Sequence, residues 1–324
     1  MLIILFISFL VLMTMGIPIA FSMVISSLIA LVYNETPLFV IVQSMITSVD
    51  SFSLMAIPFF MIAGELMDSG GISRRLVRFA RACVGSITGG LGMTCVLASA
   101  IFAGISGSAS ADTAAIGTIM MPSMIKNGYP KGYAASLQAC AGALGPIIPP
   151  SLVMIIYGTI TGLSIGELFM AGAIPGVLIA IGLMVVNYFV ARKLGIKGEG
   201  EFRIKELAVS FVDSIWALIA PFIVVGGILG GVFTATEAGV ILAVYSFIVG
   251  LFVYKEYGIR DLPRIIKKAA ATTSMIMIIV ACASVFGWIL ASQQFPKLAA
   301  NFLLSLSDDR NMIMFLVVVF LFIV

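Results

Sequence analysis

Histidine is absent from the sequence, and charged residues are scarce. None of the 324 residues is histidine, and only 10% are aspartate, glutamate, lysine or arginine. A chain without histidine has no His-based general base, no Ser-His-Asp triad and no His metal ligand. It also has no GxxxxGK phosphate-binding loop, so we expect no use of ATP by the chain itself. We therefore predict that the protein is not an enzyme.

Cysteine is also rare and shows no metal-binding spacing. The four cysteines lie scattered in apolar segments without a CxxC pair: Cys83, Cys95, Cys140 and Cys282. This pattern favours buried free thiols over disulfides or a zinc site.

Apolar residues make up most of the chain. They account for 61% of it, and the mean hydropathy is +1.19. Because a helix needs about 20 apolar residues to cross the hydrocarbon core, the sequence predicts an all-α polytopic protein of the lipid bilayer. The expected spans are residues 2–33, 39–67, 133–162, 168–191, 211–233, 237–254, 270–292 and 311–324.

Basic residues indicate the orientation of these spans. Lysine and arginine gather at 74–81, 192–205 and 255–268, whereas the loops at 34–37 and 161–167 carry none. Placing the basic loops in the cytoplasm puts the N-terminus inside. Residues 72–81 have apolar and basic faces at helical spacing, which predicts an interfacial arm helix. The net charge of +3 requires no nucleic-acid partner.

A polar stretch, GISGSASADTAAIG, interrupts the apolar pattern at residues 104–117. Both flanks are expected in the cytoplasm, and the second limb, with about 13 apolar residues, is too short to cross. We therefore predict a re-entrant hairpin that turns at 104–112. Non-helical backbone at that depth is tolerated only where it is buried in protein or lines a wet cavity, so the tip should face a site.

A second break is expected in residues 140–162. Pro146, Pro149 and Pro150 interrupt a segment otherwise long enough to span the membrane. Proline removes a backbone donor and clashes with the preceding turn, so we expect this helix to split near 145–150.

Split helices offer ligands for ions of both signs. The last carbonyls of the first halves, at Ala103, Gly145 and Ile148, would suit a bare cation such as sodium. The N-terminus of the second hairpin limb, capped by Ser110 or Asp112, would suit a carboxylate.

Small and polar residues in membrane helices also have other roles. Small residues also let membrane helices approach closely, and Gly172 and Gly176 are interpreted in that way. An intramembrane enzyme would need a base to activate Ser106, and a channel would need a continuous polar stripe. The short limb, the polar tip, the intramembrane Asp112 and the proline break coincide, which favours a binding site. We expect Glu65 to pair with a nearby arginine.

The sequence also repeats its own pattern. A shift of about 223 residues lays 60–79 on 283–302, with the polar and apolar order preserved. An odd number of intervening crossings would invert the second copy, and inverted repeats with broken helices are typical of secondary transporters. The second copy stops before its hairpin tip at Val324, so we expect the natural protein to continue.

The tip, the loop GALGPIIPPS, the segment MAIPFFMIAGELM and the stretch GGVFTATEAG together resemble the large membrane subunit of tripartite ATP-independent periplasmic (TRAP) transporters, within the ion transporter superfamily. The resemblance implies inverted repeats with re-entrant hairpins and an elevator mechanism. It implies sodium-coupled import of an organic acid anion, of C4-dicarboxylate or sialic acid type, across the bacterial inner membrane. It also implies two partners, a small four-helix membrane subunit and a soluble periplasmic binding protein. The alternative is an anion channel or facilitator without sodium coupling.

The resemblance also implies functional residues. The sodium (Na+) ligands carry over onto Ala103, Ser106, Gly145, Ile148 and Pro150, and the substrate-binding residues onto Ser108, Ser110 and Asp112.

Five segments are expected along the chain. Residues 1–81 form scaffold spans and the interfacial arm, 82–166 the first hairpin and broken helix of the transport domain, 167–236 connecting spans, 237–310 the second-repeat scaffold and arm, and 311–324 the start of a second hairpin.

Overall fold

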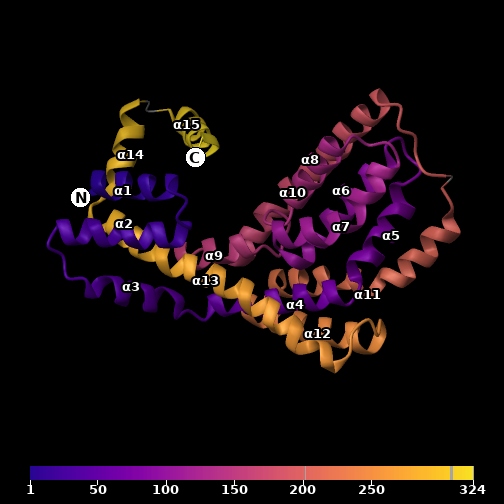
Figure 1. Ribbon diagram of the computed structural model, residues 1–324, viewed down its shortest axis with the longest axis horizontal. Helices are drawn as coiled ribbons and strands as arrows, with labels where there is room; N and C mark the ends of the chain where they lie inside the picture. Colours follow the sequence, from indigo (N-terminus) through magenta and orange to yellow (C-terminus); the bar gives the residue numbers. More distant parts are fainter. Residues whose placement is uncertain (201, 307–308, 324) are drawn as a thin grey trace. The chain divides into compact units, whose positions relative to one another are not determined.

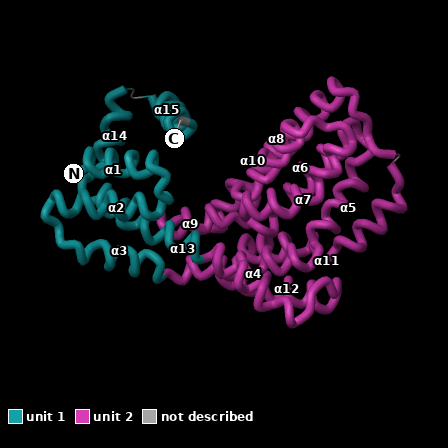
Figure 2. Tube along the Cα trace, viewed as in Figure 1, with its two compact units in different colours: residues 1–50, 274–324 teal, residues 51–273 magenta. Residues whose placement is uncertain are grey.

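The computed structural model describes residues 1–200, 202–306 and 309–323, and within these ranges it contains helices and irregular segments but no strand. The expected all-α class is confirmed. The chain divides into two compact units, residues 1–50 with 274–324 and residues 51–273 (Figure 2).

The first unit contains both ends of the chain. Its helices are α1 (Leu2–Thr14), α2 (Ile19–Tyr33), α3 (Phe39–Val49), α14 (Phe295–Leu306), α15 (Arg310–Ile323) and the second part of α13 (Leu262–Ser292) (Figure 1). Leu5, Leu31 and Ile289 are fully buried together, and the Phe6 and Phe286 rings meet edge to face at 5.9 Å. Because lipid tails are as apolar as leucine, close packing rather than exclusion of water stabilises such contacts.

The second unit carries the remaining helices. They are α4 (Ala56–Ser69), α5 (Ile72–Val84), α6 (Gly90–Ser106), α7 (Ala109–Lys126), α8 (Lys131–Gly142), α9 (Leu152–Thr161), α10 (Ile165–Lys193), α11 (Ile204–Leu229) and α12 (Ala235–Ile248), with the first part of α13. A π-helical segment, Val249–Val253, continues α12, and single 3₁₀ turns lie at Ser53–Met55 and Ile259–Asp261.

The hairpin and the split helix are present where the sequence predicts them. Helices α6 and α7 pack against each other and are joined by the two residues Gly107 and Ser108. Helices α8 and α9 are separated by residues 143–151, which contain the three prolines. Proline chemistry therefore correctly located the break.

Two expected spans are interrupted. Residues 2–33 form two helices because Gly16, in the left-handed region at φ 81°, and Pro18 end the first helix and start the second. Residues 39–67 are broken between α3 and α4. Among the described residues, four helical segments are each long and apolar enough to cross a membrane: Ile165–Lys193, Ile204–Leu229, Ala235–Val253 and Ile259–Ser292.

The helix boundaries repeat with the period of the sequence. Helix α4 ends at Ser69 and α13 ends at Ser292, while α5 begins at Ile72 and α14 begins at Phe295. Each pair is separated by the shift found in the sequence, so the repeat is confirmed at the level of helix boundaries.

The expected arm helix is α5, and its apolar face is buried. Ile72 and Leu76 are fully buried, whereas Arg74 and Arg78 are exposed. The 3.6-residue period thus correctly predicts an apolar face and a basic face. The expectation of an interfacial helix did not anticipate that the apolar face packs on the protein itself.

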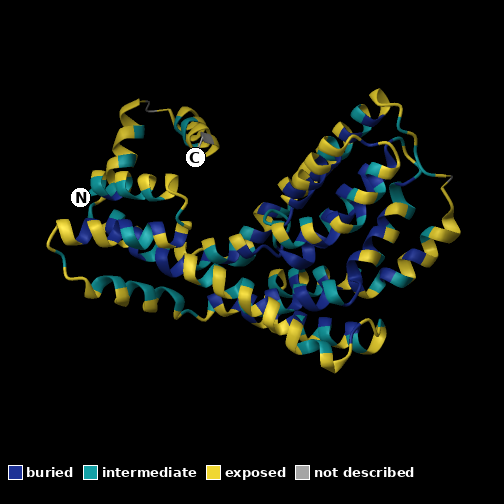
Figure 3. Ribbon diagram, in the orientation of Figure 1, coloured by how far each residue is buried: buried dark blue, intermediate teal, exposed yellow. Residues whose placement is uncertain are grey.

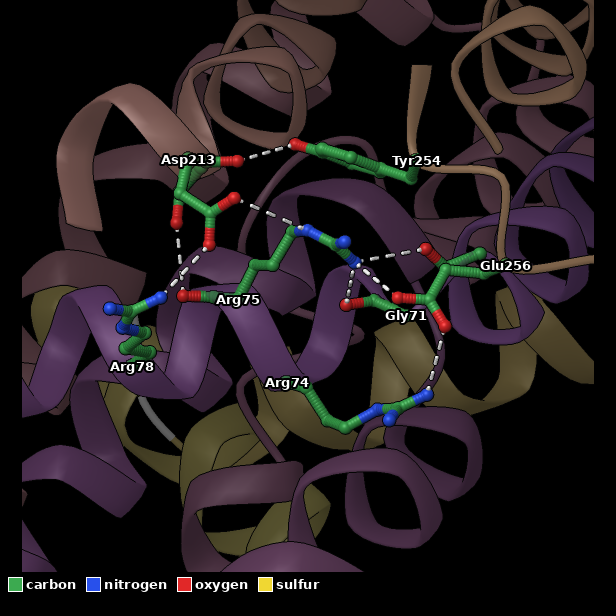
Figure 4. Close-up of polar contacts among 9 residues, drawn as sticks. Gly71, Arg74, Arg75, Arg78, Asp213, Tyr254 and Glu256 are labelled. Carbon is green, nitrogen blue, oxygen red and sulfur yellow. Dashed lines mark hydrogen bonds and ion pairs between the residues drawn. The ribbon is translucent and has the colours of Figure 1, made fainter. Parts of the chain in front are cut away.

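Arg75 joins α5 to two other parts of the second unit (Figure 4). Its Nη1 donates to Glu256 Oε1 at 3.0 Å and to the Gly71 carbonyl at 3.1 Å. Its Nε lies 3.7 Å from Asp213 Oδ1 on α11, and the guanidinium stacks over the Tyr254 ring at 3.9 Å. One half-buried guanidinium therefore fixes α5, α11 and the segment after α12 together.

The cysteines differ in exposure. All four are free thiols; Cys95 and Cys282 are buried as expected, but Cys140 is exposed because it lies on the outer face of the half-helix α8.

Replacing Arg75 with glutamine should destabilise the second unit. The carboxylates of Glu256 and Asp213 and the Tyr254 ring lose their common partner. We therefore expect the free energy of unfolding to fall by about 2–3 kcal/mol, measured by thermal unfolding in detergent. Arg78→Gln is the control: its guanidinium is 62% exposed and pairs with Asp213 alone, so the loss should stay below about 1 kcal/mol. Equal effects of the two variants would contradict this assignment.

Candidate functional site

Four helix ends meet in the second unit. The C-terminal ends of α6 and α8 and the N-terminal ends of α7 and α9 surround the hairpin tip and the proline break. The Leu152 amide donates to the Gly107 carbonyl at 3.4 Å, and a side chain on Gly145 would meet the Ser108 backbone at 2.7 Å. The structure therefore brings the two predicted broken elements into direct contact.

Gly107 is the residue that permits this contact. Its φ is 59°, in the left-handed region, and a Cβ there would lie 2.6 Å from the Pro150 carbonyl oxygen. Only glycine satisfies both the conformation and the close approach.

The predicted sodium ligands of the break have free carbonyls. Within the described residues, the carbonyls of Gly145, Ile148 and Pro150 accept no hydrogen bond, although Gly145 and Pro150 are buried. Buried carbonyls without a partner are rare in proteins. The Ala103 carbonyl differs, because it accepts the Gly107 amide at 3.1 Å and so closes α6.

The serines of the tip form a connected group. The Ser108 amide donates to Ser106 Oγ at 3.4 Å, and the hydroxyls of Ser108 and Ser110 lie 3.1 Å apart. Ser106 is buried, Ser108 is half-buried and Ser110 is exposed. Two hydroxyls thus stand at the N-terminus of α7, where an anion is favoured by the helix dipole.

The predicted N-cap of α7 was wrong. Ser108, rather than Ser110 or Asp112, is the cap, and its hydroxyl accepts the Ala111 amide at 3.5 Å. The left-handed Gly107 directly before Ser108 turns the chain, so the helix begins two residues earlier than the polar pattern suggests.

Asp112 lies apart from the exposed serines. Its side chain is fully buried, and neither carboxylate oxygen has a hydrogen-bond partner among the described residues. It faces Ser99 of α6, across the interior of the hairpin.

A small cavity separates α4 from the hairpin. It has a volume of about 40 Å³ and is lined by Gly64 and Glu65 of α4, Ser106 and Ala111 of the hairpin, and Lys268 of α13. This volume is large enough to admit an ion or a water molecule.

Lys268 rather than an arginine is the partner of Glu65. Its Nζ lies 2.8 Å from Glu65 Oε2, and the Glu65 side chain is 11% exposed. Leu66 and Ile265 pack together with Tyr257 beside this pair, which positions the lysine.

The base of the hairpin is fastened to α10 by Asn187. The Asn187 Nδ2 donates to the Gly89 carbonyl at 3.0 Å, and the Tyr133 hydroxyl donates to Asn187 Oδ1 at 3.2 Å. The neighbouring Tyr129 hydroxyl accepts the Gly92 amide at 3.1 Å, and burial raises the pKa of Tyr129.

Helix α10 also packs on the proline break. A side chain on Gly176 would meet Ile148 at 2.6 Å, and Gly172 lies as close to Met154 and Ile147. The interpretation of these glycines as close-packing residues is confirmed. The remaining face of α10 is rich in exposed positions, in contrast to α6 (Figure 3).

Sequence reasoning missed three of these polar side chains. Ser99 is a polar residue four positions before Ala103, and Asn187 is a lone amide in an apolar span. Each therefore gave a weak sequence signal of a polar contact inside the protein. Lys268 carried none, because its partner Glu65 is distant in the sequence.

Comparison with known families covers nearly the whole chain. The family described as "Tripartite ATP-independent periplasmic transporter, DctM component" matches residues 6–324. This range includes the hairpin, the break and α10.

Several characterised proteins are similar to the chain. The sialic acid TRAP transporter large permease protein SiaM of Vibrio cholerae is 37% identical over 303 residues, covering 93% of this chain and 71% of the relative. The 2,3-diketo-L-gulonate TRAP transporter large permease protein YiaN of Escherichia coli is 38% identical over 310 residues, covering 95% and 73%. The C4-dicarboxylate TRAP transporter large permease protein DctM of Pseudomonas aeruginosa is 40% identical over 257 residues, covering 79% and 60%.

A methyl group on Gly145 should disturb the contact between tip and break. Gly145→Ala would push against the Ser108 backbone, and we expect a loss of about 1–3 kcal/mol in thermal unfolding. In Gly132→Ala, on α8, the new Cβ meets no atom within 4 Å, so this control should keep its stability. An unchanged melting temperature in both variants would show that the contact is loose.

Lys268→Gln should be more harmful than removal of both charges. The single change leaves the buried Glu65 without its partner, at a cost of about 1–2 kcal/mol given the exposure of the lysine. The double variant Glu65→Gln/Lys268→Gln should recover most of this loss, and Lys267→Gln is the exposed control on the same helix. Additive losses in the double-mutant cycle would contradict a coupled pair.

Proposed function

The chain belongs to the DctM family, the large permease of tripartite ATP-independent periplasmic transporters, and from this we propose that it imports an organic acid anion together with sodium ions. It is a multi-pass membrane transport protein rather than an enzyme. We place it in the bacterial inner membrane, as is usual for transporters that receive their substrate in the periplasm.

The proposal of sodium binding rests on the unpaired carbonyls of the break. Gly145, Ile148 and Pro150 each present a carbonyl without a hydrogen bond in the described structure, beside the C-terminal end of α6 with Ala103 and Ser106. Carbonyls at the ends of broken membrane helices are favourable ligands for sodium. A bound sodium ion would supply the partner that these carbonyls lack.

The serines at the start of α7 support an anionic substrate. Ser108 and Ser110 offer hydroxyl donors at the positive N-terminal end of α7, close to the unpaired carbonyls of the break. Asp112 stays a predicted member of this site; because its carboxylate is buried, it would act on the anion through a cation and not by direct contact. Relatives named for sialic acid, C4-dicarboxylates and 2,3-diketo-L-gulonate indicate the class of substrate.

Two partners belong to the proposal. A small four-helix membrane subunit would complete the membrane part, and a soluble periplasmic protein would deliver the anion. The family description names a tripartite, periplasmic system, which is consistent with both. Transport would follow an elevator mechanism in which the hairpin and the broken helix move as one body.

Uptake into proteoliposomes tests this function. The full-length permease is reconstituted with its small subunit, the binding protein and labelled sialic acid, C4-dicarboxylate or diketogulonate. We expect accumulation that requires both sodium and the binding protein. A tenfold sodium gradient supplies about 1.4 kcal/mol per ion, so it should support roughly tenfold accumulation with one coupled ion and about a hundredfold with two, for electrically balanced transport.

Replacing external sodium with potassium is the control, and Ser106→Trp should abolish uptake by filling the tip. Flux that proceeds without sodium and only down the gradient of the substrate would instead establish a channel or facilitator.

A further inference from the structure

A polar pocket opens in the second unit between α5 and the chain that leads into α11. Its volume is about 490 Å³, which lies in the range of pockets that hold small organic molecules. None of the described residues of the hairpin tip or the break lines it. The lining that matters for a ligand consists of three arginines, two serines and one aromatic residue: Arg78, Arg81, Arg203, Ser86, Ser210 and Phe202.

Close backbone contacts build this pocket. The Glu199 amide donates to the Gly85 carbonyl at 2.8 Å, and a side chain on Gly198 would collide with the Ser86 carbonyl. Arg81 Nε also lies 2.7 Å from Glu199 Oε2. The chain that follows α10 is thus fixed to the C-terminal end of α5, so the pocket is a formed part of the fold.

The arginines of the pocket have donors to spare. A guanidinium carries five N–H donors. In the described structure Arg78, Arg81 and Arg203 each form one ion pair, and each side chain is more than half exposed. The two segments that carry them, 72–85 and 192–206, hold nine lysines and arginines against three glutamates. An anionic ligand is therefore favoured.

The pocket lies at the depth of lipid headgroups. Arg203 is the N-cap of α11, a helix of 26 residues that is long and apolar enough to cross a membrane. Such a helix spans about 39 Å, whereas the hydrocarbon core is about 30 Å thick, so its ends reach the headgroup region. The basic residues on both segments place this end in the cytoplasmic leaflet.

Exposed apolar side chains adjoin the basic lining. Phe202 lines the pocket, and Ile204 and Phe211 directly follow the lining residues Arg203 and Ser210 in the sequence. All three apolar side chains are exposed. A soluble anion would gain nothing from this apolar surface, whereas the acyl chains of a lipid would cover it.

We propose that this pocket binds the headgroup of an anionic phospholipid of the cytoplasmic leaflet. Arginine binds phosphate oxygens through paired N–H donors, and Arg81 and Arg203 would hold the phosphodiester in this way. Basic pockets beside membrane helices on the cytoplasmic side are favourable sites for anionic headgroups. The bound lipid would join α5 to the start of α11, and its acyl chains would lie along the exposed face of α11.

Thermal unfolding in mixed micelles tests the site. The purified permease in neutral detergent is titrated with phosphatidylglycerol, with phosphatidylcholine of the same acyl chains, or with inorganic phosphate, all at equal ionic strength. We expect only phosphatidylglycerol to raise the melting temperature in a saturable manner. Arg81→Gln/Arg203→Gln should weaken its apparent affinity by about tenfold. The matched control is Arg260→Gln/Arg264→Gln, which removes the same charge at exposed positions of another basic segment and should keep the wild-type affinity.

The lipid-dependent shift is compared rather than the basal melting temperature, because Arg81→Gln also breaks the ion pair with Glu199. If the double variant does not fold, Arg203→Gln decides, and an unchanged affinity in that variant overturns the site. An equal shift with phosphatidylcholine would show a bulk lipid effect, and an equal shift with inorganic phosphate would show a site for soluble anions. Equal losses of affinity in the two double variants would show attraction by surface charge alone. Each of these three results overturns the proposal, and none of them bears on sodium-coupled uptake.

Discussion

The contact between the hairpin tip and the proline break is the constraint on which the second unit depends. Gly107 lies against Pro150, and Gly145 lies against Ser108, so backbone meets backbone without intervening side chains. The prolines of the break remove backbone donors, which leaves carbonyls there unpaired, and this closeness sets those carbonyls beside the N-terminus of α7. Regular helices in the same place would satisfy every backbone group internally and leave nothing for a ligand.

Local signals in the sequence predicted the elements around this contact. Proline at 146, 149 and 150 located the break, and the glycine and serine stretch located the turn. The same chemistry was underestimated near Pro18, where a long apolar run concealed the end of α1. The cap at Ser108 was missed because it depends on the left-handed geometry of Gly107, which the residue pattern alone does not determine.

Side-chain partners were harder to predict than elements. Glu65 and Lys268 are joined only by the packing of α13 on α4, and the sequence separation hides that relation. The pairing of Ser99 with Asp112 depends on the rotation of α6 against α7, since a small rotation would turn either residue toward a different neighbour. Hydrophobic periodicity gave no help here, because neither hairpin helix has a single apolar face opposite a polar one.

Asn187 restricts movement of the hairpin relative to α10. It holds α10 to the base of the hairpin at Gly89, while Gly172 and Gly176 hold the other half of α10 to the break. A displacement of the hairpin past α10 would have to break buried hydrogen bonds at one end and separate glycine from isoleucine at the other. Helix α10 is thus held against the hairpin and the break along its length. Its outer face, with Ile174 and Leu178, is exposed, so lipid would contact α10 during any such motion.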